Sequence, residues 1–270
     1  MLHLICALKC EARPLIHHFQ LQHVADANIF PCYLDRNTGL TLTVSGPGKI
    51  QAAAATSYTC EYFKCLKSDG WLNIGIAGHQ LLDIGHPVLA HKILDAGSGQ
   101  SWFPQIIFSP SCETRIIKTI DKPSTDYEES VFDMEAAGFY AIASRVGTSE
   151  LVHVLKIISD NAAHPAEKLD EKFFTGLIEN QLDTVDQLIN QIMPLSSELE
   201  KLHKPPRYFE DCIKRWHFSQ YEQHALTRIL NRWQILKPDQ NPLENVLAVK
   251  NGKGFLTLLE QELNSSLINY

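Results

Sequence analysis

Three largely apolar runs restrict the folds that this chain can adopt. Residues 2–8, 71–76 and 151–158 have the length of strands, and they lack the regular alternation of a strand with one face in water. Segments with helical patterns lie between them, including an alanine-rich stretch from residue 49 to about residue 63. Strands that alternate with helices predict an α/β fold, a three-layer sandwich around a central, mixed and largely parallel sheet.

Polar residues follow the ends of these runs. Glu11 comes soon after the first run, the small-residue turn 75–78 ends the second, and Ser159 and Asp160 end the third. In open α/β sheets, ligands bind beyond the carboxyl ends of the strands. We therefore expect these residues to meet at one site.

An acidic pair stands at the entry to a second alanine-rich segment. Asp133 and Glu135 flank Met134 just before this segment, which has a helical pattern up to about residue 145. Acids in a first helical turn complement the helix dipole. Taken alone, the pair is more typical of a helix start than of a binding site.

The chain changes character after Pro194. Residues 196–270 have no strong strand pattern, and the segments that begin at Ser197 and Ser219 fit the capping-box pattern of a helix start. We expect one α/β domain over residues 1–195 and a small all-α appendage over residues 196–270. With 10 Lys and Arg against 9 Asp and Glu, the appendage has too little positive charge to favour nucleic-acid binding. It is either an interaction module or a cover for the first domain.

Composition excludes several classes of function. The 270 residues carry a net charge of -7, which disfavours binding through nucleic-acid phosphates. No apolar run approaches the roughly 20 residues of a membrane span, and the first residues lack the basic start of a secretory signal. The 7 cysteines are irregularly spaced, without a CxxC pair, so we expect reduced thiols, no metal site and a cytoplasmic protein.

Five short motifs together resemble one enzyme superfamily. They occur in the order of the motifs of the nucleoside phosphorylase and nucleosidase superfamily, and they are most similar to those of methylthioadenosine/S-adenosylhomocysteine nucleosidases. The resemblance covers about residues 1–192 and stops before the appendage. The five motifs are Ala7-Leu8-Lys9-Cys10-Glu11, Ser45-Gly46-Pro47-Gly48-Lys49, Gly75-Ile76-Ala77-Gly78, Asp133-Met134-Glu135-Ala136 and Ile158-Ser159-Asp160.

The resemblance implies cleavage of the N-glycosidic bond of a purine nucleoside of the adenosine type, without a cofactor. A purine leaves readily only when a ring nitrogen is protonated, which requires an acid that holds its proton near neutral pH. The resemblance gives this role to Asp160 and makes Ser159 its orienting partner. Burial beyond a strand end could raise the pKa of such a group. The plainer alternative is that Ser159 and Asp160 cap the following helix.

The resemblance also assigns the sugar and base contacts. It gives Glu135 the hydrogen bonds from the ribose hydroxyls and Met134 the packing against the sugar. Asp133 stands where nucleosidases usually carry Glu, so its part in substrate binding is less defined. The remaining assignments concern small residues: Ala77 and Gly78 leave room for a flat base, and Gly46 and Gly48 let backbone amides approach an anion or a polarised water.

Three alternatives for the chemistry follow. Glu11 matches the family glutamate that activates water, which favours hydrolysis. A phosphorylase would need cationic or polar donors for phosphate, and Arg13, Lys49 and His79 lie close to the matched motifs. The third alternative is a catalytically weak nucleoside-binding protein whose appendage is a helical interaction module.

Several positions depart from the nucleosidase pattern. Ile76 replaces a hydroxyl residue, His79 replaces Gly, and Lys156 replaces Arg. The segment between residues 85 and 115 is shorter than in nucleosidases, where it contributes to the pocket and to a dimer interface. Substrate range is therefore open, as is the choice between a homodimer and a higher homo-oligomer.

Overall fold

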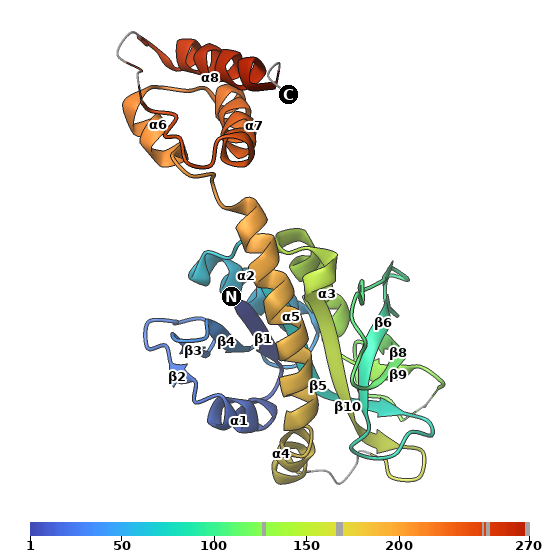
Figure 1. The fold of residues 1–270 in the computed structure, drawn as a ribbon. Helices are drawn as coiled ribbons and strands as arrows, with labels where there is room; N and C mark the ends of the chain where they lie inside the picture. The colour runs from blue at the N-terminus through green and yellow to red at the C-terminus, as the bar shows by residue number, and fades with distance from the viewer. Residues whose placement is uncertain (126–127, 166–169, 245, 247–248, 268–270) are drawn as a thin grey trace. The chain divides into compact units, whose positions relative to one another are not determined.

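The chain forms two compact units, Met1–Leu202 and His203–Tyr270. The computed structural model describes residues 1–125, 128–165, 170–244, 246 and 249–267 (Figure 1). The division falls inside a helix, a little later than the boundary expected from the sequence. Each unit has its own hydrophobic core.

A mixed sheet forms the centre of the first unit, as predicted. Its strand order is β10-β6-β8-β9-β5-β1-β4-β3-β2, and β7 pairs with β6. Parallel pairing joins β4, β1, β5 and β10, whereas β3–β4, β5–β9 and β6–β10 are antiparallel. Because β5 also pairs with β10, the strands β5, β10, β6, β8 and β9 close into a ring. The strands are β1 (Leu2–Cys6), β2 (Gln22–His23), β3 (Cys32–Asp35), β4 (Leu40–Val44), β5 (Gly70–His79), β6 (Pro87–Asp95), β7 (Ser101–Trp102), β8 (Glu113–Thr119), β9 (Val131–Asp133) and β10 (Val152–Asn161).

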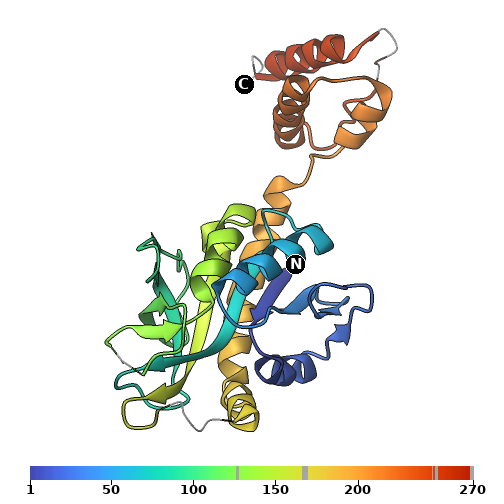
Figure 2. The ribbon, with the colours of Figure 1, turned by 180° about the vertical axis from the view of Figure 1, so that it is seen from behind.

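Helices cover both faces of this sheet, which gives the expected three layers (Figures 1 and 2). Along β1, Leu4 packs into the core beneath α1 (Lys9–His18), α4 (Glu171–Glu179) and α5 (Leu182–His203). Its neighbour Ile5 packs into the opposite core, beneath α2 (Lys49–Phe63) and α3 (Ala136–Val146). Successive side chains of a strand point to opposite faces. A strand buried on both faces is therefore largely apolar, as residues 2–8 are, with His3 as the buried polar exception.

A glycine sets the distance between α2 and α3. A Cβ atom placed on Gly138 would lie 1.9 Å from the backbone oxygen of Lys49. Any side chain there would push the two helices apart. Gly138 therefore lets the start of α2 and the start of α3 meet, and both starts carry motifs of the site.

The structure corrects two expectations about helices. The long helix expected from about residue 168 to residue 192 is two helices, α4 and α5, and residues 168 and 169 lie outside the described part. The helix start expected at Ser197 is also wrong, because α5 continues through Pro194 to His203. Its apolar residues Leu188, Ile192, Leu195 and Leu199 keep helical spacing against the core, which outweighs the capping pattern.

The second unit is helical, with α6 (Phe209–Arg215), α7 (Gln220–Leu236) and α8 (Gly252–Leu267). The capping box predicted at Ser219 is confirmed: Glu222 accepts a hydrogen bond from the Ser219 amide at 2.8 Å, and Ser219 Oγ accepts one from the Glu222 amide at 3.3 Å. Trp216 and Phe255 stack in the core, with ring centroids 4.5 Å apart. In the part of the chain described, no helix is long and apolar enough to cross a membrane.

Candidate active site

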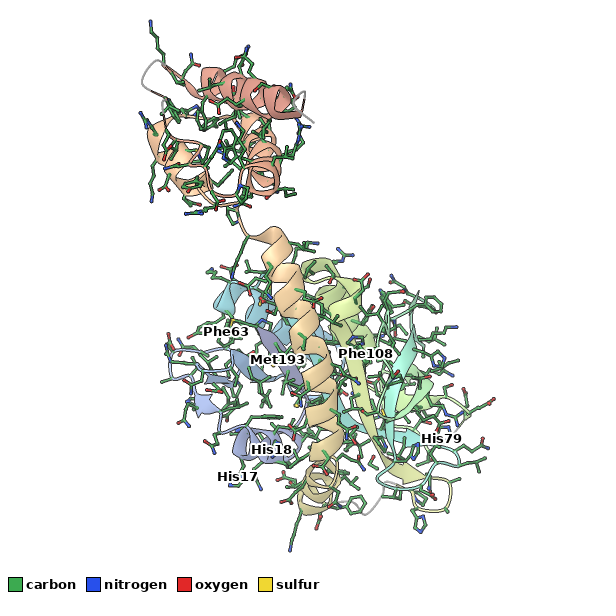
Figure 3. The ribbon with its side chains drawn as sticks, in the orientation of Figure 1. His17, His18, Phe63, His79, Phe108 and Met193 are labelled. Atoms are coloured by element: carbon green, nitrogen blue, oxygen red, sulfur yellow. The ribbon has the colours of Figure 1, made fainter. Side chains whose placement is uncertain are left out.

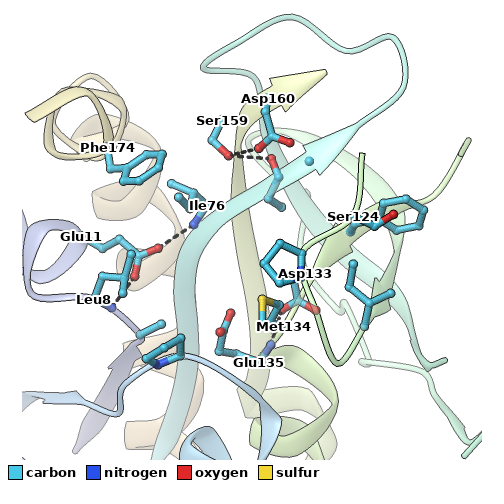
Figure 4. A pocket seen from close by; sticks show the side chains of 17 residues that line it. Leu8, Glu11, Ile76, Ser124, Asp133, Met134, Glu135, Ser159, Asp160 and Phe174 are labelled. Carbon is cyan, nitrogen blue, oxygen red and sulfur yellow. Dashed lines mark hydrogen bonds between the residues drawn. The ribbon is translucent and has the colours of Figure 1, made fainter. Parts of the chain in front are cut away.

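A cavity of about 210 Å³ opens beyond the carboxyl ends of β1, β5 and β10. In Figure 4, Glu11 lies at the left of this cavity, Glu135 at the bottom and Asp160 at the top. Four of the five motifs reach its wall through several residues each. The lining residues are Ala7, Leu8, Glu11, Pro47, Ile76, Ala77, Gly78, Ile120, Pro123, Ser124, Phe132, Asp133, Met134, Glu135, Ser159, Asp160 and Phe174.

Glu11 is a buried carboxylate held by backbone amides. It lies in the first turn of α1, where Oε2 accepts a hydrogen bond from the Leu8 amide at 2.8 Å and Oε1 accepts one from the Ile76 amide at 3.0 Å. Its side chain is 2% exposed. Burial raises the pKa of the Glu11 carboxyl from 4.5 to about 7, although the two amides and Lys156 favour its charged form. Such a group accepts a proton readily at neutral pH.

A buried lysine lies behind the cavity. Lys156 Nζ contacts Asp133 Oδ2 at 2.9 Å and Glu135 Oε2 at 3.6 Å. A Cβ atom on Gly75 would come within 3.1 Å of Glu11 Oε1 and 3.3 Å of Lys156 Nζ, so any larger residue would press on both side chains. Burial by itself would lower the pKa of Lys156, but the three carboxylates raise it above its usual range. The ammonium of Lys156 therefore lies among three acids, with Asp133 as its nearest ion-pair partner.

The two acids of the pair before α3 have different environments. Asp133 Oδ1 accepts a hydrogen bond from Thr119 Oγ1 at 2.6 Å, and Oδ2 accepts one from the Ala136 amide at 2.7 Å. Asp133 thus fixes the start of α3 and neutralises Lys156. Glu135 instead reaches α2, where Oε1 accepts a hydrogen bond from the Gly48 amide at 2.8 Å. Burial raises the pKa of Glu135, and the charge of Lys156 opposes this.

Ser159 and Asp160 lie at the end of β10. Ser159 Oγ contacts Asp160 Oδ1 at 2.6 Å and the Ala77 backbone oxygen at 3.2 Å. The register of β10 on β5 shifts between Ile158 and Asp160, which places Asp160 opposite Gly78. Ser159 is buried, whereas Asp160 is only partly buried. The irregular strand end therefore directs both side chains to the cavity wall, where neither caps a helix in the described structure.

Eight of the residues predicted from the sequence are brought together around the cavity. They are Glu11, Ala77, Gly78, Asp133, Met134, Glu135, Ser159 and Asp160. Gly46 and Gly48 flank Pro47 at the start of α2 but do not line the cavity. Both have positive φ angles, of 81° and 96°, and the amide of Gly48 binds Glu135. The sequence predicted that this amide approaches an anion or a polarised water, and the group that it binds is the carboxylate of Glu135.

The three candidate phosphate ligands are not brought together. Arg13 is exposed and borders a different hollow, with His17 and His18 on α1 (Figure 3). Lys49 pairs with Asp95 and Asp121, each at 2.8 Å. None of the three candidates lines the cavity.

His79, the third candidate, serves the backbone instead. Its Nε2 lies 2.9 Å from the Glu129 backbone oxygen, and its Nδ1 accepts hydrogen bonds from the amides of Leu81 and Leu82. These contacts fit a neutral ring that donates from Nε2, and burial lowers the pKa of His79. This histidine organises the turn after β5.

Sequence reasoning missed several residues of the site. Lys156 was noted only as a departure from the family, although a lysine inside an apolar strand is itself a signal of buried acids. Phe132 lines the cavity because β9 pairs with β5 and β8, and this short strand was not predicted. Phe174 comes from α4, and nothing in its local sequence marks it.

The chain has the fold of nucleosidases of known structure. A 5′-methylthioadenosine nucleosidase from Arabidopsis thaliana is 18% identical, with a TM-score of 0.57 over 71% of this chain and 95% of the other. A methylthioadenosine/S-adenosylhomocysteine nucleosidase from Colwellia psychrerythraea, solved with adenine, is 18% identical, with a TM-score of 0.54 over 72% and 94%. Futalosine hydrolase of Helicobacter pylori is 16% identical, with a TM-score of 0.53 over 70% and 97%. No protein-family model matches the sequence, and no curated protein matches it.

Proposed function

We propose that this chain hydrolyses the N-glycosidic bond of a purine nucleoside of the adenosine type. The observation that carries the proposal is Glu11, a buried carboxyl with a pKa of about 7 on the wall of a cavity shared with Glu135 and Asp160. A base for water should have a pKa near the working pH. The enzymes named in the similar structures, nucleosidases and a futalosine hydrolase, support the same class of substrate.

In this proposal Glu11 takes the proton from the attacking water. Its two oxygens are fixed by the amides of Leu8 and Ile76, so the carboxylate does not need to reorient during the reaction. The Ile76 amide comes from β5, whose end forms the floor for the base at Ala77 and Gly78. The water and the glycosidic bond are thereby held by adjacent residues, and this proximity lowers the barrier.

Asp160 supplies the proton for the departing purine. The hydroxyl of Ser159 donates a hydrogen bond to Asp160 Oδ1 at 2.6 Å and thereby orients the carboxyl group. Protonation of a ring nitrogen lets the base leave as a neutral molecule. The acid and the base of the reaction thus come from β10 and α1, on different sides of the cavity.

Glu135 binds the ribose hydroxyls and faces the positive charge that develops on the sugar. Its position is set by the Gly48 amide at 2.8 Å and by Lys156 at 3.6 Å. A fixed carboxylate stabilises an oxocarbenium-like transition state. Met134, the neighbour of Glu135 on the cavity wall, packs against the sugar.

The lining favours water over phosphate as the nucleophile. Across the described residues, the wall of the cavity contains no Arg and no Lys. Lys156 is the cation behind it, and Asp133 engages its ammonium at 2.9 Å. Phosphate would also meet the charges of Glu11 and Glu135, which repel an anion.

The test is an incubation with adenosine, inosine, methylthioadenosine or S-adenosylhomocysteine, with and without phosphate. The release of free base is measured by chromatography. We expect phosphate-independent release by the unaltered protein, and loss of release in Glu11→Gln and in Asp160→Asn. Two exposed carboxylates serve as matched controls, Glu198→Gln and Asp239→Asn, and both should keep full activity. No release from any nucleoside, or an active Asp160→Asn protein with intact circular dichroism, would overturn these assignments.

A further inference from the structure

A cluster of metal-ligating side chains lies outside the nucleoside cavity. His3, Cys65 and Asp69 each offer one ligand atom, and these three atoms lie within 4.8 Å of one another. They come from β1, from the turn after α2 and from the residue before β5. None of the three lines the cavity of the proposed active site.

We propose that His3, Cys65 and Asp69 form a zinc site that ties the start of the central sheet to the end of α2. Nitrogen, sulfur and carboxylate oxygen are the ligands that Zn²⁺ takes in proteins. With one thiolate and one carboxylate, the ion and its ligands have no net charge. A site without net charge can be buried at a lower free-energy cost than a charged one.

Two of the three distances between ligand atoms are close to those of tetrahedral coordination, and the third pair, Cys65 and Asp69, lies within 4.8 Å. His3 Nε2 lies 3.1 Å from Cys65 Sγ and 3.5 Å from Asp69 Oδ2. Bonds of 2.0–2.3 Å at tetrahedral angles place neighbouring ligand atoms roughly 3.3–3.7 Å apart. Small side-chain shifts are therefore enough for all three atoms to contact one ion.

The surroundings already orient two of the ligands. His3 Nδ1 lies 2.7 Å from Thr41 Oγ1, and a proton on Nδ1 directs the lone pair of Nε2 at Cys65 and Asp69. Asp69 Oδ2 accepts a hydrogen bond from the Leu66 amide at 2.7 Å, and the Met1 amine contacts Oδ1 at 2.7 Å. Such outer partners fix ligand geometry at zinc sites.

The site also has a path for the ion and for the proton that it displaces. His3 and Asp69 are buried, at 0% and 4% exposure, whereas Cys65 is partly exposed. On binding, the Cys65 thiol loses its proton to solvent and the thiolate coordinates the metal. A water molecule reaching the ion past Cys65 completes the coordination. Phe63, labelled in Figure 3 at the end of α2, closes another side, with its ring centroid 5.9 Å from that of His3.

Cobalt substitution tests the proposal on the full chain. We expect one equivalent of Co²⁺ to give a thiolate-to-cobalt charge-transfer band in the near ultraviolet, which Zn²⁺ abolishes by displacement. Cys65→Ser should lose the band, while His3→Gln and Asp69→Asn should weaken binding at least about tenfold. Cys112→Ser is the matched control, because Cys112 is also a partly exposed thiol, and it should keep the band. Absence of the band from the unaltered protein, or its persistence in Cys65→Ser, overturns the proposal.

A second measurement avoids substitution altogether. Zn²⁺ should slow alkylation of Cys65 by iodoacetamide, read residue by residue by mass spectrometry, without slowing alkylation of Cys112. Equal rates at Cys65 with and without Zn²⁺ would contradict the site. Because both readouts are independent of nucleoside cleavage, neither depends on the proposed function.

Discussion

Replacing Glu11 by Gln should abolish base release. It should also remove a loss of folding stability that the Glu11 carboxyl causes at neutral pH. The Glu11 carboxyl has a pKa of about 7 in the fold, against an ordinary value of 4.5. Between these two values the unfolded chain has lost the proton and the folded chain has kept it. The stability due to Glu11 is therefore complete below pH 4.5 and is lost as pH rises through 7.

The size of this effect follows from the shift in pKa. One pKa unit corresponds to about 1.36 kcal/mol, so the shift from 4.5 to about 7 destabilises the folded protein by about 3 kcal/mol above pH 7. Most of this loss, about 2 to 3 kcal/mol, falls between pH 5 and pH 8. Glutamine cannot ionise, so Glu11→Gln should lack this part of the pH dependence. The variant also loses one acceptor for the amides of Leu8 and Ile76, worth about 1 kcal/mol at every pH.

Hydrogen exchange gives the free energy of opening for the first unit separately. Peptides from β1 and β5, compared at pH 5 and pH 8 after correction for intrinsic exchange rates, should show Glu11→Gln gaining about 2 to 3 kcal/mol relative to the unaltered protein as pH rises. Glu198→Gln, an exposed acid, should show no such gain. If both variants keep the pH dependence of the unaltered protein, Glu11 is not a carboxyl with a raised pKa, and its role as the base loses its support.

Two further perturbations test the structure around the site. Lys156→Met removes the cation that lies 2.9 Å from the buried carboxylate of Asp133. We expect the free energy of unfolding, measured by urea titration, to fall by about 3 kcal/mol. An unchanged midpoint would contradict the buried ion pair. Gly138→Ala should prevent α2 and α3 from meeting, because its Cβ would lie 1.9 Å from the Lys49 backbone oxygen, and we expect a sharp fall in the melting temperature. Gly176→Ala, in α4 with no atom within 4 Å of the added Cβ, is the matched control and should stabilise by up to about 1 kcal/mol; equal melting temperatures for the two variants would contradict the packing.

The order of the layers could be predicted because long periodic segments carry strong signals. The apolar runs became β1, β5 and β10, and α2 lies where an alanine-rich helix was predicted, after the turn at residues 45–50 and up to about residue 63. Parallel strands bring their carboxyl ends to one edge of a sheet, so the sequence alone predicts that Glu11 and Asp160 lie together. Both line the same cavity.

Contacts between distant segments could not be predicted from local patterns. Asp133 and Glu135 have the same local context and both contact Lys156, yet Asp133 binds Thr119 and Glu135 binds Gly48. The difference depends on the pairing of β9 with β8 and on the close approach of α2 to α3. Neither contact leaves a periodic pattern in the local sequence from which it could be predicted.

Polar residues near a site were the hardest to assign. His79 has the chemistry of a phosphate ligand, but its ring nitrogens bind the backbone of Glu129, Leu81 and Leu82. Lys49 likewise pairs with Asp95 at 2.8 Å. Proximity in sequence to a motif says little about the direction in which a side chain points, because that direction is fixed by the loops around it.

The fate of the water oxygen tests the central claim most directly. When methylthioadenosine or adenosine is incubated in ¹⁸O-labelled water without phosphate, the proposed reaction places ¹⁸O at the anomeric carbon of the released sugar and leaves the purine unlabelled. The same label should appear when phosphate is added, with no sugar phosphate formed, and Glu11→Gln should give no product. Base release that requires phosphate, or unlabelled sugar as the product, would contradict water activation by Glu11.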